Sequence, residues 1–382
     1  MFAFLYKKAP IPKEIDDKLS KHILSFLGSE DIACVLPQVH PTLKKELETS
    51  YAELRASACE RVLIYKKTLK PSSIFENPDS FAYIKLSGGY SNTTYKLSKP
   101  GSRAYISRIA GVGSELIIDR TAEWHNASIA AELELNPTIV YNDERGSQLS
   151  HCLPSPQPLT PELLQHHPEY ITEIALQLRK LHQSPKKFHN NVNIFKRNAD
   201  FYALIKDSEI ALPEAYAPIR ARTAQLESLF EKLNIPQVPC HNDTYYNNFL
   251  LSDGKLWLID WEYSGNHDPI WDLAYFSNLA KLNEEQNTHL LTTYFNCLDF
   301  QSTYSLEYFR FIAYSLVVKD FLILWTFVQL ANKNMTVSES ELIKWSDNAL
   351  KDSAEIMSDD KFNKTVELLE EASHEPPKLS IE

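Results

Sequence analysis

Residues 241–265 read HNDTYYNNFLLSDGKLWLIDWEYSG, and this stretch decides how the fold is interpreted. Asp253 and Gly254 separate two apolar runs, and an Asp-Gly pair between such runs is a strong signal for a two-residue β-hairpin turn. With this turn, Leu251 faces Leu256 on the partner strand, and Leu250 likewise faces Trp257. The stretch therefore predicts a hairpin whose open end carries the polar residues on either side.

The open end of the predicted hairpin brings Asn248 next to Ile259 and Asp260. Side chains alternate between the two faces of a strand, so strict pairing would put Asn248 and Asp260 on opposite faces. One of them must lie just beyond the regular ladder if both are to meet. Asp243, in the preceding loop, is close enough in sequence to point to the same place.

An amide and a carboxylate at a strand end, with a second carboxylate nearby, suit a hard cation and leave room for phosphate oxygens. In phosphoryl transfer the metal offsets developing charge, and an Asp accepts the proton of the attacking hydroxyl. We therefore expect Asp243 to be the catalytic base, Asn248 and Asp260 to be magnesium ligands, and His241 to orient the loop. The alternative is a polar turn whose Asp and Asn side chains bond their own backbone. Any one residue fits that alternative, whereas the combined pattern favours catalysis.

Composition supports a globular protein with more than one lobe. The chain has 382 residues, of which 43% are hydrophobic and 23% charged, and its net charge is -11. The sequence contains no block of Lys and Arg that could follow a phosphate backbone, which disfavours nucleic acid and anionic membranes as partners. Five singly placed cysteines without a CxxC pair indicate neither a disulfide framework nor a zinc site.

One apolar stretch, residues 311–331, is long enough to span a bilayer. Lys319 and Asp320 lie at its centre, where each charge costs about 2.5–3.5 kcal/mol. We therefore expect a buried helix. The N-terminus, MFAFLYKKAP, does not have the pattern of a secretory signal, and a cytoplasmic location is expected.

The pattern of residues predicts an α+β chain with a small β-rich lobe and a large α-rich lobe after a small helical unit. Residues 1–50 are expected to form that helical unit and 51–80 a connecting helix. A small β-rich N-lobe should follow over 81–153, with one helix inside it, and a large α-rich C-lobe over 154–360. The tail, 361–382, is expected to be loose.

The stretch 241–265 and its continuation WEYSGNHDPIWDLA resemble the catalytic core of choline/ethanolamine kinases, in the aminoglycoside phosphotransferase superfamily of protein-kinase-like enzymes. The resemblance implies a bilobal, protein-kinase-like fold. The similarity covers roughly residues 80–350. It implies ATP and magnesium as cofactors and an alcohol as phosphate acceptor. It also implies a substrate-side role for Glu262 and a structural role for Asp272.

The same resemblance assigns nucleotide-binding residues in the N-lobe. LSGGYSNTTYKL is similar to the family's phosphate loop, with a plain hairpin turn as the alternative. Arg108 stands where this family often places a phosphate-binding Arg, and Glu123 is its expected ion-pair partner, unless the two are unrelated surface charges. The loop residues that carry this expectation are Gly88, Gly89, Ser91 and Asn92.

A quaternary ammonium is recognised by aromatic faces and a nearby acid. Aromatic residues at helical spacing are more often core, so that alternative stays open. Choline kinases commonly carry two tryptophans three apart in this helix, whereas this chain has Leu322 and Trp325. The candidate acceptor-binding residues are Trp325, Trp345, Tyr314, Trp261, Tyr263, Glu262 and Asp268.

The N-terminal run IPKEI…ILSFLGSEDIACVLPQV is similar to an F-box, the module that docks on Skp1 of ubiquitin ligases. The alternative is an amphipathic helical extension of the N-lobe. Joined to a choline-kinase-like domain, an F-box resembles bacterial effectors delivered into host cytoplasm, as in Legionella. The expected partner-binding residues are Pro12, Ile15, Ile23, Phe26, Leu27 and Ile32.

Two functions follow from these patterns. The first is an ATP- and magnesium-dependent kinase for a small alcohol, choline or a relative. Its acceptor could instead be ethanolamine, an aminoglycoside, thiamine or a protein hydroxyl. The second is a non-catalytic or differently specific adaptor that uses the kinase fold as a binding surface. An adaptor needs none of the expected catalytic and nucleotide-binding residues, so their presence favours the kinase. These residues are Arg108, Glu123, Asp243, Asn248 and Asp260.

Overall fold

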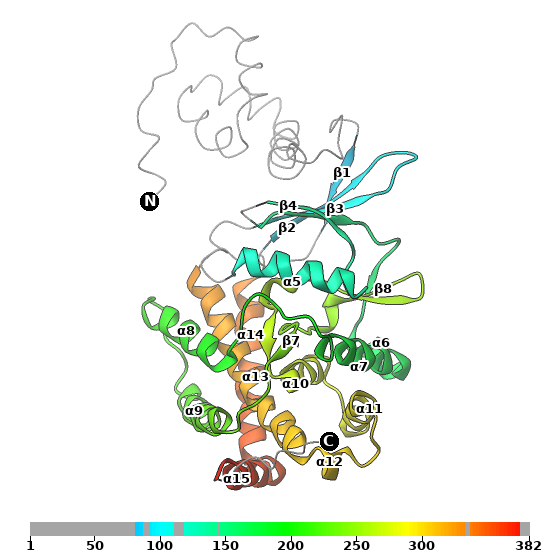
Figure 1. Ribbon diagram of the computed structural model, residues 1–382. Helices are drawn as coiled ribbons and strands as arrows, with labels where there is room; N and C mark the ends of the chain where they lie inside the picture. The colour runs from blue at the N-terminus through cyan, green and yellow to red at the C-terminus, as the bar shows by residue number, and fades with distance from the viewer. Residues whose placement is uncertain (1–80, 87–91, 111–117, 144–145, 333–336, 375–382) are drawn as a thin grey trace, which may run out of the picture. The chain divides into compact units, whose positions relative to one another are not determined.

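The computed structural model describes residues 81–86, 92–110, 118–143, 146–332 and 337–374 (Figure 1). These residues group into two compact units. The first holds an antiparallel sheet, and the second holds one helix from before Ile139 and all that follows Cys152.

The first unit is a five-stranded antiparallel sheet with the order β1-β2-β3-β5-β4. Tyr95 and Leu97 alternate with the half-buried Lys96 along β2, and they pack on one face with Ile109 and Leu149. This alternation is the reason the segment forms a half-buried strand. All five predicted strands are confirmed: β1 (Ala82–Lys85), β2 (Asn92–Ser98), β3 (Tyr105–Ala110), β4 (Ile139–Asn142) and β5 (Gln148–His151).

The second unit is mainly helical. Its short strands are β6 (Gln157–Pro158), β7 (Val238–Cys240), β8 (Phe249–Ser252), β9 (Lys255–Leu258) and β10 (Gly265–His267). Its α-helices are α5 (Arg120–Glu132), α6 (Pro161–His166), α7 (Pro168–His182), α8 (Ile194–Lys206), α9 (Tyr216–Lys232), α10 (Pro269–Ala280), α11 (Glu284–Phe295), α12 (Phe300–Thr303), α13 (Ser305–Asn332), α14 (Glu339–Ser358) and α15 (Asp360–His374).

Helix α13 is the central helix of this unit and packs on α8, α10, α14 and α15. Its most apolar window is long enough to cross a membrane, but 78% of that window is buried in the fold, as expected for a core helix. The two central charges have partners, because Lys319 Nζ lies 2.8 Å from Asp352 and Asp320 accepts a hydrogen bond of 2.6 Å from the Tyr216 hydroxyl. The predicted buried helix is confirmed.

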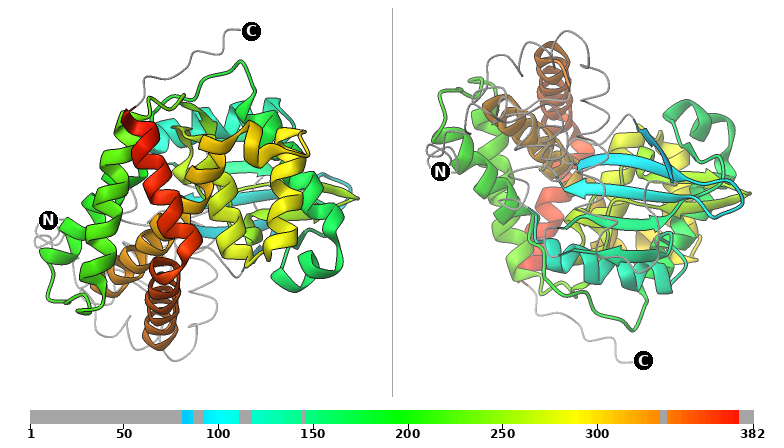
Figure 2. Two further views of the ribbon diagram at one scale, coloured as in Figure 1. Left: turned by 90° about the horizontal axis from the view of Figure 1, so that it is seen from below. Right: turned by 90° about the horizontal axis from the view of Figure 1, so that it is seen from above.

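Helix α15 corrects the prediction of a loose tail from residue 361. Residues 361–374 belong to this helix, which lies beside α9 and α13 (red in Figure 2, left). Phe362, Val366 and Leu369 recur at intervals of four and three residues and are buried. That spacing is the amphipathic period of a helix, and it outweighs the polar composition of the tail.

Helix α5 belongs by its contacts to the second unit, whereas the sequence placed it in the N-lobe. Asn126 donates a hydrogen bond of 3.1 Å to the carbonyl of Ser264, and the Leu258 amide donates to the carbonyl of Leu135 at 2.8 Å. These contacts join the helix to the hairpin region that carries the predicted site.

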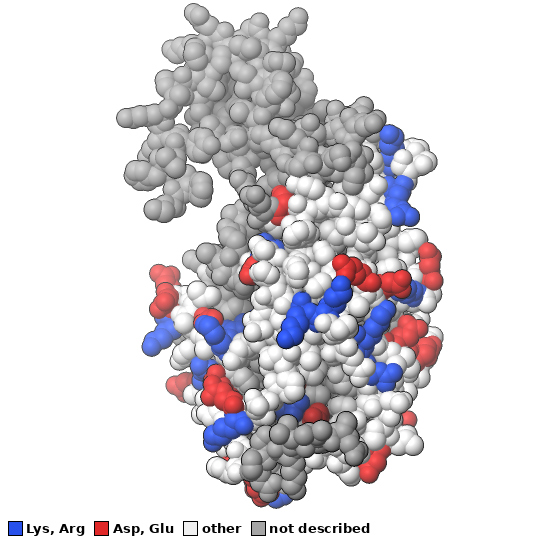
Figure 3. Space-filling model, viewed as in Figure 1, with Lys and Arg blue, Asp and Glu red and all other residues white. Residues whose placement is uncertain are grey.

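Charged side chains are mixed on the surface. On the face drawn in Figure 3, basic and acidic side chains alternate over the described residues. This distribution agrees with the sequence, in which basic residues form no long block.

Candidate phosphotransfer site

The hairpin has the predicted register. In β8 and β9, Leu250 pairs with Trp257 and Leu251 pairs with Leu256. Asp253 and Gly254 form the turn with φ angles of 51° and 73°. Both angles lie in the left-handed region, as in the type I′ turn that fits the twist of a two-residue hairpin.

The open end of the hairpin resolves the problem of alternation. Asn248 is still held to the ladder, because the Ile259 amide donates to its carbonyl at 2.9 Å. Asp260 has left the ladder and adopts a left-handed conformation with φ 68° and ψ 66°, just before a 3-10 turn, η7 (Trp261–Tyr263). The sequence required one of the two residues to lie in loop geometry, and the structure shows that it is Asp260.

Asp243 lies beside Asn248. The Asn248 amide nitrogen donates to the Asp243 carboxylate at 3.1 Å and to the Asp243 carbonyl at 3.0 Å. Burial, together with the charges of Asp260 and Glu262, raises the pKa of Asp243 to about 7, although hydrogen bonds from Tyr275 and Asn248 oppose the shift. Asp243 and Asn248 are therefore in contact, and the charge of Asp260 acts on Asp243. Their separate roles as base and metal ligands remain predictions.

His241 connects the loop to the hairpin. One ring nitrogen, Nε2, lies 2.9 Å from the carbonyl of Ile259, and the Asp243 amide donates to the other, Nδ1, at 3.2 Å. The ring also packs edge-on against Trp261, with centroids 4.6 Å apart. These contacts fit the orienting role predicted for His241.

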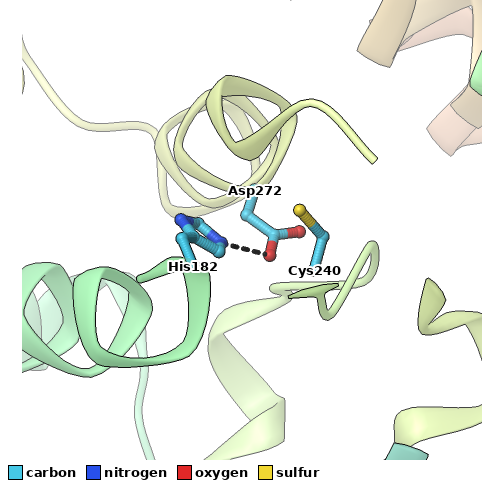
Figure 4. Close-up of side chains that lie close together, drawn as sticks. All are labelled: His182, Cys240 and Asp272. Carbon is cyan, nitrogen blue, oxygen red and sulfur yellow. Dashed lines mark hydrogen bonds and ion pairs between the residues drawn. The ribbon is translucent and has the colours of Figure 1, made fainter. Parts of the chain in front are cut away.

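Asp272 anchors the catalytic loop from helix α10. Its two carboxylate oxygens accept the backbone amides of His241 at 2.8 Å and Asn242 at 2.7 Å. His182, from α7, lies 3.0 Å from the same carboxylate, and Cys240 points toward the pair (Figure 4). Burial raises the pKa of Asp272, but the hydrogen bonds and nearby histidines lower it by more, so the carboxylate stays charged.

The group of His182, Cys240 and Asp272 has the ligand types of a metal site, but its donors serve the fold. Both Asp272 oxygens are occupied by protein N–H groups. Burial raises the pKa of the Cys240 thiol, which keeps it protonated. The structural role expected for Asp272 agrees with this arrangement. The sequence contained no signal for His182, which lies 90 residues away.

A second acidic group includes the predicted metal ligand. Ligand oxygens of Glu123, Asp260 and Glu262 all lie within 4.8 Å of one another. Arg120 moderates this charge, since its Nη1 lies 2.6 Å from Glu123 and 3.7 Å from Glu262. Sequence analysis missed Arg120, although its position one turn before Glu123 was a usable signal.

The donor set fits magnesium. Asn248 uses its amide nitrogen on Asp243, which leaves the amide oxygen available for a cation. The carboxylate of Asp260 supplies a second hard oxygen ligand within an acidic group. Amide and carboxylate oxygens with open positions are the donors from which a phosphate-bound magnesium is held.

The structure describes only some of the residues predicted to bind the nucleotide. Gly88, Gly89 and Ser91 lie outside the described residues. Asn92 begins β2 and pairs with Ala110 on β3. Arg108 lies on β3 opposite Thr94 and Gln148. The expected ion pair of Arg108 with Glu123 would join the two units and remains a prediction.

Several candidate acceptor residues belong to a buried network instead of one pocket. Asp268 caps α10 by accepting the Ile270 amide, and it also accepts Arg310 Nε at 2.9 Å and the Tyr314 hydroxyl at 3.1 Å. Asp268 and Tyr314 are each 1% exposed, so these contacts hold helices α10 and α13 together. The alternative of core packing, which was left open for the aromatic candidates, describes Tyr314.

The tryptophans among the candidate acceptor-binding residues lie in two separate places. Trp261 is buried and donates to the carbonyl of Leu258 at 3.0 Å. Trp325 on α13 stacks with Trp345 on α14, with ring centroids 6.5 Å apart and 29° between the planes. Trp345 is partly exposed.

The F-box-like residues lie outside the described part of the chain, as do all of residues 1–80.

The hairpin, the anchored loop and the acidic group are the parts from which a phosphotransferase site can be built. The profile of the choline/ethanolamine kinase family matches residues 83–310. This chain belongs to the choline/ethanolamine kinase family and is a phosphotransferase with an alcohol acceptor.

Known proteins similar to this chain agree with that membership. Protein LicA of Haemophilus influenzae is 28% identical over 239 residues, covering 60% of this chain and 68% of LicA. A choline/ethanolamine kinase family protein from Mesorhizobium loti has the same fold, with a TM-score of 0.67 and 23% identity over 81% of this chain and 97% of its own. The choline kinase LicA of Streptococcus pneumoniae also has this fold, with a TM-score of 0.63 and 22% sequence identity. The match covers 78% of this chain and 98% of the LicA chain.

Proposed function

We propose that this protein transfers the γ-phosphoryl group of ATP to the hydroxyl of choline or a related amino alcohol. Membership of the choline/ethanolamine kinase family supplies the class of reaction. The observation that carries the proposal is the hydrogen bond of 3.1 Å between Asn248 and Asp243, formed beside Asp260. This contact holds Asp243 next to Asn248, and phosphoryl transfer needs a base beside the oxygen ligands of a metal ion.

In this proposal Asp243 accepts the proton of the attacking hydroxyl. Its raised pKa, about 7, makes it a stronger base than an exposed carboxylate. Asn248 and Asp260 would hold magnesium, which when bound offsets the charge of the phosphate oxygens. His241 and Asp272 keep the loop backbone fixed, so that the base does not move away from the acceptor.

The acceptor is proposed to be an amino alcohol because of the family and because acidic groups surround the base. Glu262 lies in the group with Asp260 and is placed to attract a cationic acceptor. Trp325 and Trp345 are the proposed aromatic faces for a quaternary ammonium, and Trp345 would supply the ring that α13 lacks at Leu322.

The test is a phosphate-transfer screen with labelled ATP and magnesium over choline, ethanolamine and related alcohols. Wild-type protein should phosphorylate at least one of them, and Asp243→Ala should abolish turnover while the protein stays folded. Asp347→Ala, an exposed carboxylate on α14, is the matched control and should keep full activity. A wild-type protein that neither binds Mg-ATP nor phosphorylates any alcohol would favour the adaptor function instead.

An adaptor function for the N-terminal segment is a separate proposal. It rests on the F-box-like pattern of residues 11–39, including Ile23 and Phe26. Binding of Skp1 by this segment is compatible with kinase activity, because the family match begins at residue 83.

A further inference from the structure

A polar pocket of about 250 Å³ lies against the turn that follows Asp260. Helix α8 forms one wall with Arg197 and Phe201, and the turn contributes Glu262 and Tyr263. Helix α8 carries none of the residues predicted for catalysis or for binding, so the arginine in the pocket wall has no role in the site described so far.

Arg197 is fixed to the turn by its guanidinium group. The guanidinium carbon lies 4.8 Å from the centre of the Tyr263 ring, and Nη2 donates a long hydrogen bond of 3.4 Å to the Tyr263 carbonyl. Tyr263 is the third residue after Asp260, so the arginine is bound to the same short turn as the predicted metal ligand.

One nitrogen of this group is unpaired. Arg197 Nη1 is buried and has no hydrogen-bond partner among the described residues. Arg310 and Arg120 of this unit each have a carboxylate partner, Asp268 at 2.9 Å and Glu123 at 2.6 Å. A buried cationic donor without an acceptor is costly, and such groups often mark a site that a ligand completes.

The charged groups near Arg197 indicate the step of the reaction in which its N–H groups can act. The carboxylates of Asp243 and Glu262 both interact electrostatically with Arg197, and Glu262 lines the same pocket. Burial lowers the pKa of Arg197 and these carboxylates oppose the shift. An arginine keeps its charge in proteins, and its planar fork matches the oxygens of a phosphoryl group.

We propose that Arg197 binds the phosphoryl group as it passes from ATP to the acceptor. This proposal rests on the proposed function. As the acceptor oxygen forms its bond to the γ-phosphorus, the bond from phosphorus to the ADP oxygen breaks and the acceptor proton passes to Asp243. Negative charge spreads over the equatorial phosphoryl oxygens, and Arg197 donates its free N–H groups to them. An arginine supplied from the same chain has this role in other phosphoryl-transfer enzymes.

The kinetic test compares Arg197→Met with wild-type protein in the full chain. Methionine keeps the apolar stem and removes the charge, so we expect kcat to fall by about 100-fold or more while KM for ATP changes little. Lys206→Met, an exposed cation on the same helix, is the control and should leave kcat unchanged. An unchanged kcat in folded Arg197→Met overturns the proposal. If that variant does not fold, Arg197→Gln makes the same comparison.

A binding test separates this proposal from the proposed function, because it needs no acceptor. The probe is ADP with magnesium and aluminium fluoride, which imitates the phosphoryl group in transfer, measured by calorimetry against ADP with magnesium alone. Aluminium fluoride should lower the Kd of ADP for wild-type protein and for Lys206→Met. The factor by which it lowers this Kd should be at least 10 times smaller in Arg197→Met. Equal gains in wild-type protein and the variant, or no gain in wild-type protein, overturn the role of Arg197.

The two proposals can fail separately. If no alcohol is phosphorylated but the fluoride gain depends on Arg197, then the acceptor assignment is wrong and Arg197 still binds the phosphoryl group. If alcohols are phosphorylated and the fluoride gain does not depend on Arg197, then the kinase function stands and the role of Arg197 falls.

Discussion

Asp260 shows how one backbone conformation assembles the site. A residue other than glycine rarely adopts a left-handed conformation, but Asp and Asn tolerate it better than most. With φ at 68°, Asp260 turns out of the β9 ladder and lies with Glu123 and Glu262. A regular strand would carry its carboxylate to the face opposite Asn248.

Replacing Asp260 by Asn tests its role as a metal ligand. Asn tolerates the same backbone and keeps the side-chain shape, so folding should be preserved while magnesium-dependent turnover falls by about 100-fold or more. The measurement is kcat as a function of magnesium concentration. Asp253→Asn removes a carboxylate from the turn of the same hairpin, also at positive φ, and should behave as wild type. Full activity in Asp260→Asn would contradict the assignment.

His267 predicts how stability depends on pH. Burial lowers its pKa from 6.5 to about 4, although Asp268 and Asp272 oppose the shift. Between these pH values the unfolded chain binds a proton that the folded chain does not, so the free energy of unfolding should decrease as pH falls from 6.5 towards 4. The shift corresponds to about 3 kcal/mol for this group.

Urea unfolding at pH 7 and pH 4.5 measures this effect. His267→Gln should lose less stability between the two pH values than wild-type protein does. His374→Gln, at an exposed position, should show the same pH dependence as wild type. If the free energy of unfolding of His267→Gln depended on pH as it does in wild-type protein, other groups would be the cause of the loss of stability.

Helices and strands were predictable where the pattern of a segment repeats. The hairpin register followed from the turn Asp253-Gly254 and from alternating apolar residues, and the structure agrees residue by residue. Helix α15 was missed, because its polar composition was given more weight than the spacing of Phe362, Val366 and Leu369. The period of apolar residues was the more reliable signal.

Leu369→Ala tests whether α15 is part of the core. Leu369 is fully buried, and deleting most of such a side chain costs about 2–4 kcal/mol through lost packing and the cavity left behind. Thermal or urea unfolding measures the difference. Leu298, at 91% exposure, is the matched control, and Leu298→Ala should change stability by less than about 0.5 kcal/mol. An equally small effect at Leu369 would mean that α15 does not pack in solution.

At the scale of the whole molecule, the kinase function and the N-terminal segment are separable in sequence. The family profile begins at residue 83 and ends at 310, and it contains the loop, the hairpin and helix α10. The F-box-like pattern lies entirely before residue 50. This arrangement predicts two activities that can be removed independently.

A chain that begins at residue 79 should keep phosphate transfer within a few-fold of the full chain, because none of the proposed site residues precedes residue 88. The full chain should retain purified Skp1 in a pull-down, and the shortened chain should not. Double substitution Ile23→Asp and Phe26→Asp provides the matched control in the full chain. Equal retention of Skp1 by all three proteins, or by none of them, would contradict the F-box interpretation.

The sequence by itself determined the local elements of this protein: the strands, the hairpin and its register, and the identity of Asp243, Asn248 and Asp260 as one group. These follow from turn chemistry and residue period, which act over a few neighbouring positions. Only the tertiary structure decided which groups from distant segments join them. His182 reaches Asp272 across 90 residues, and Arg120 approaches Glu262 from another helix. Such contacts depend on how helices pack around a common core, and no spacing within a single segment records that.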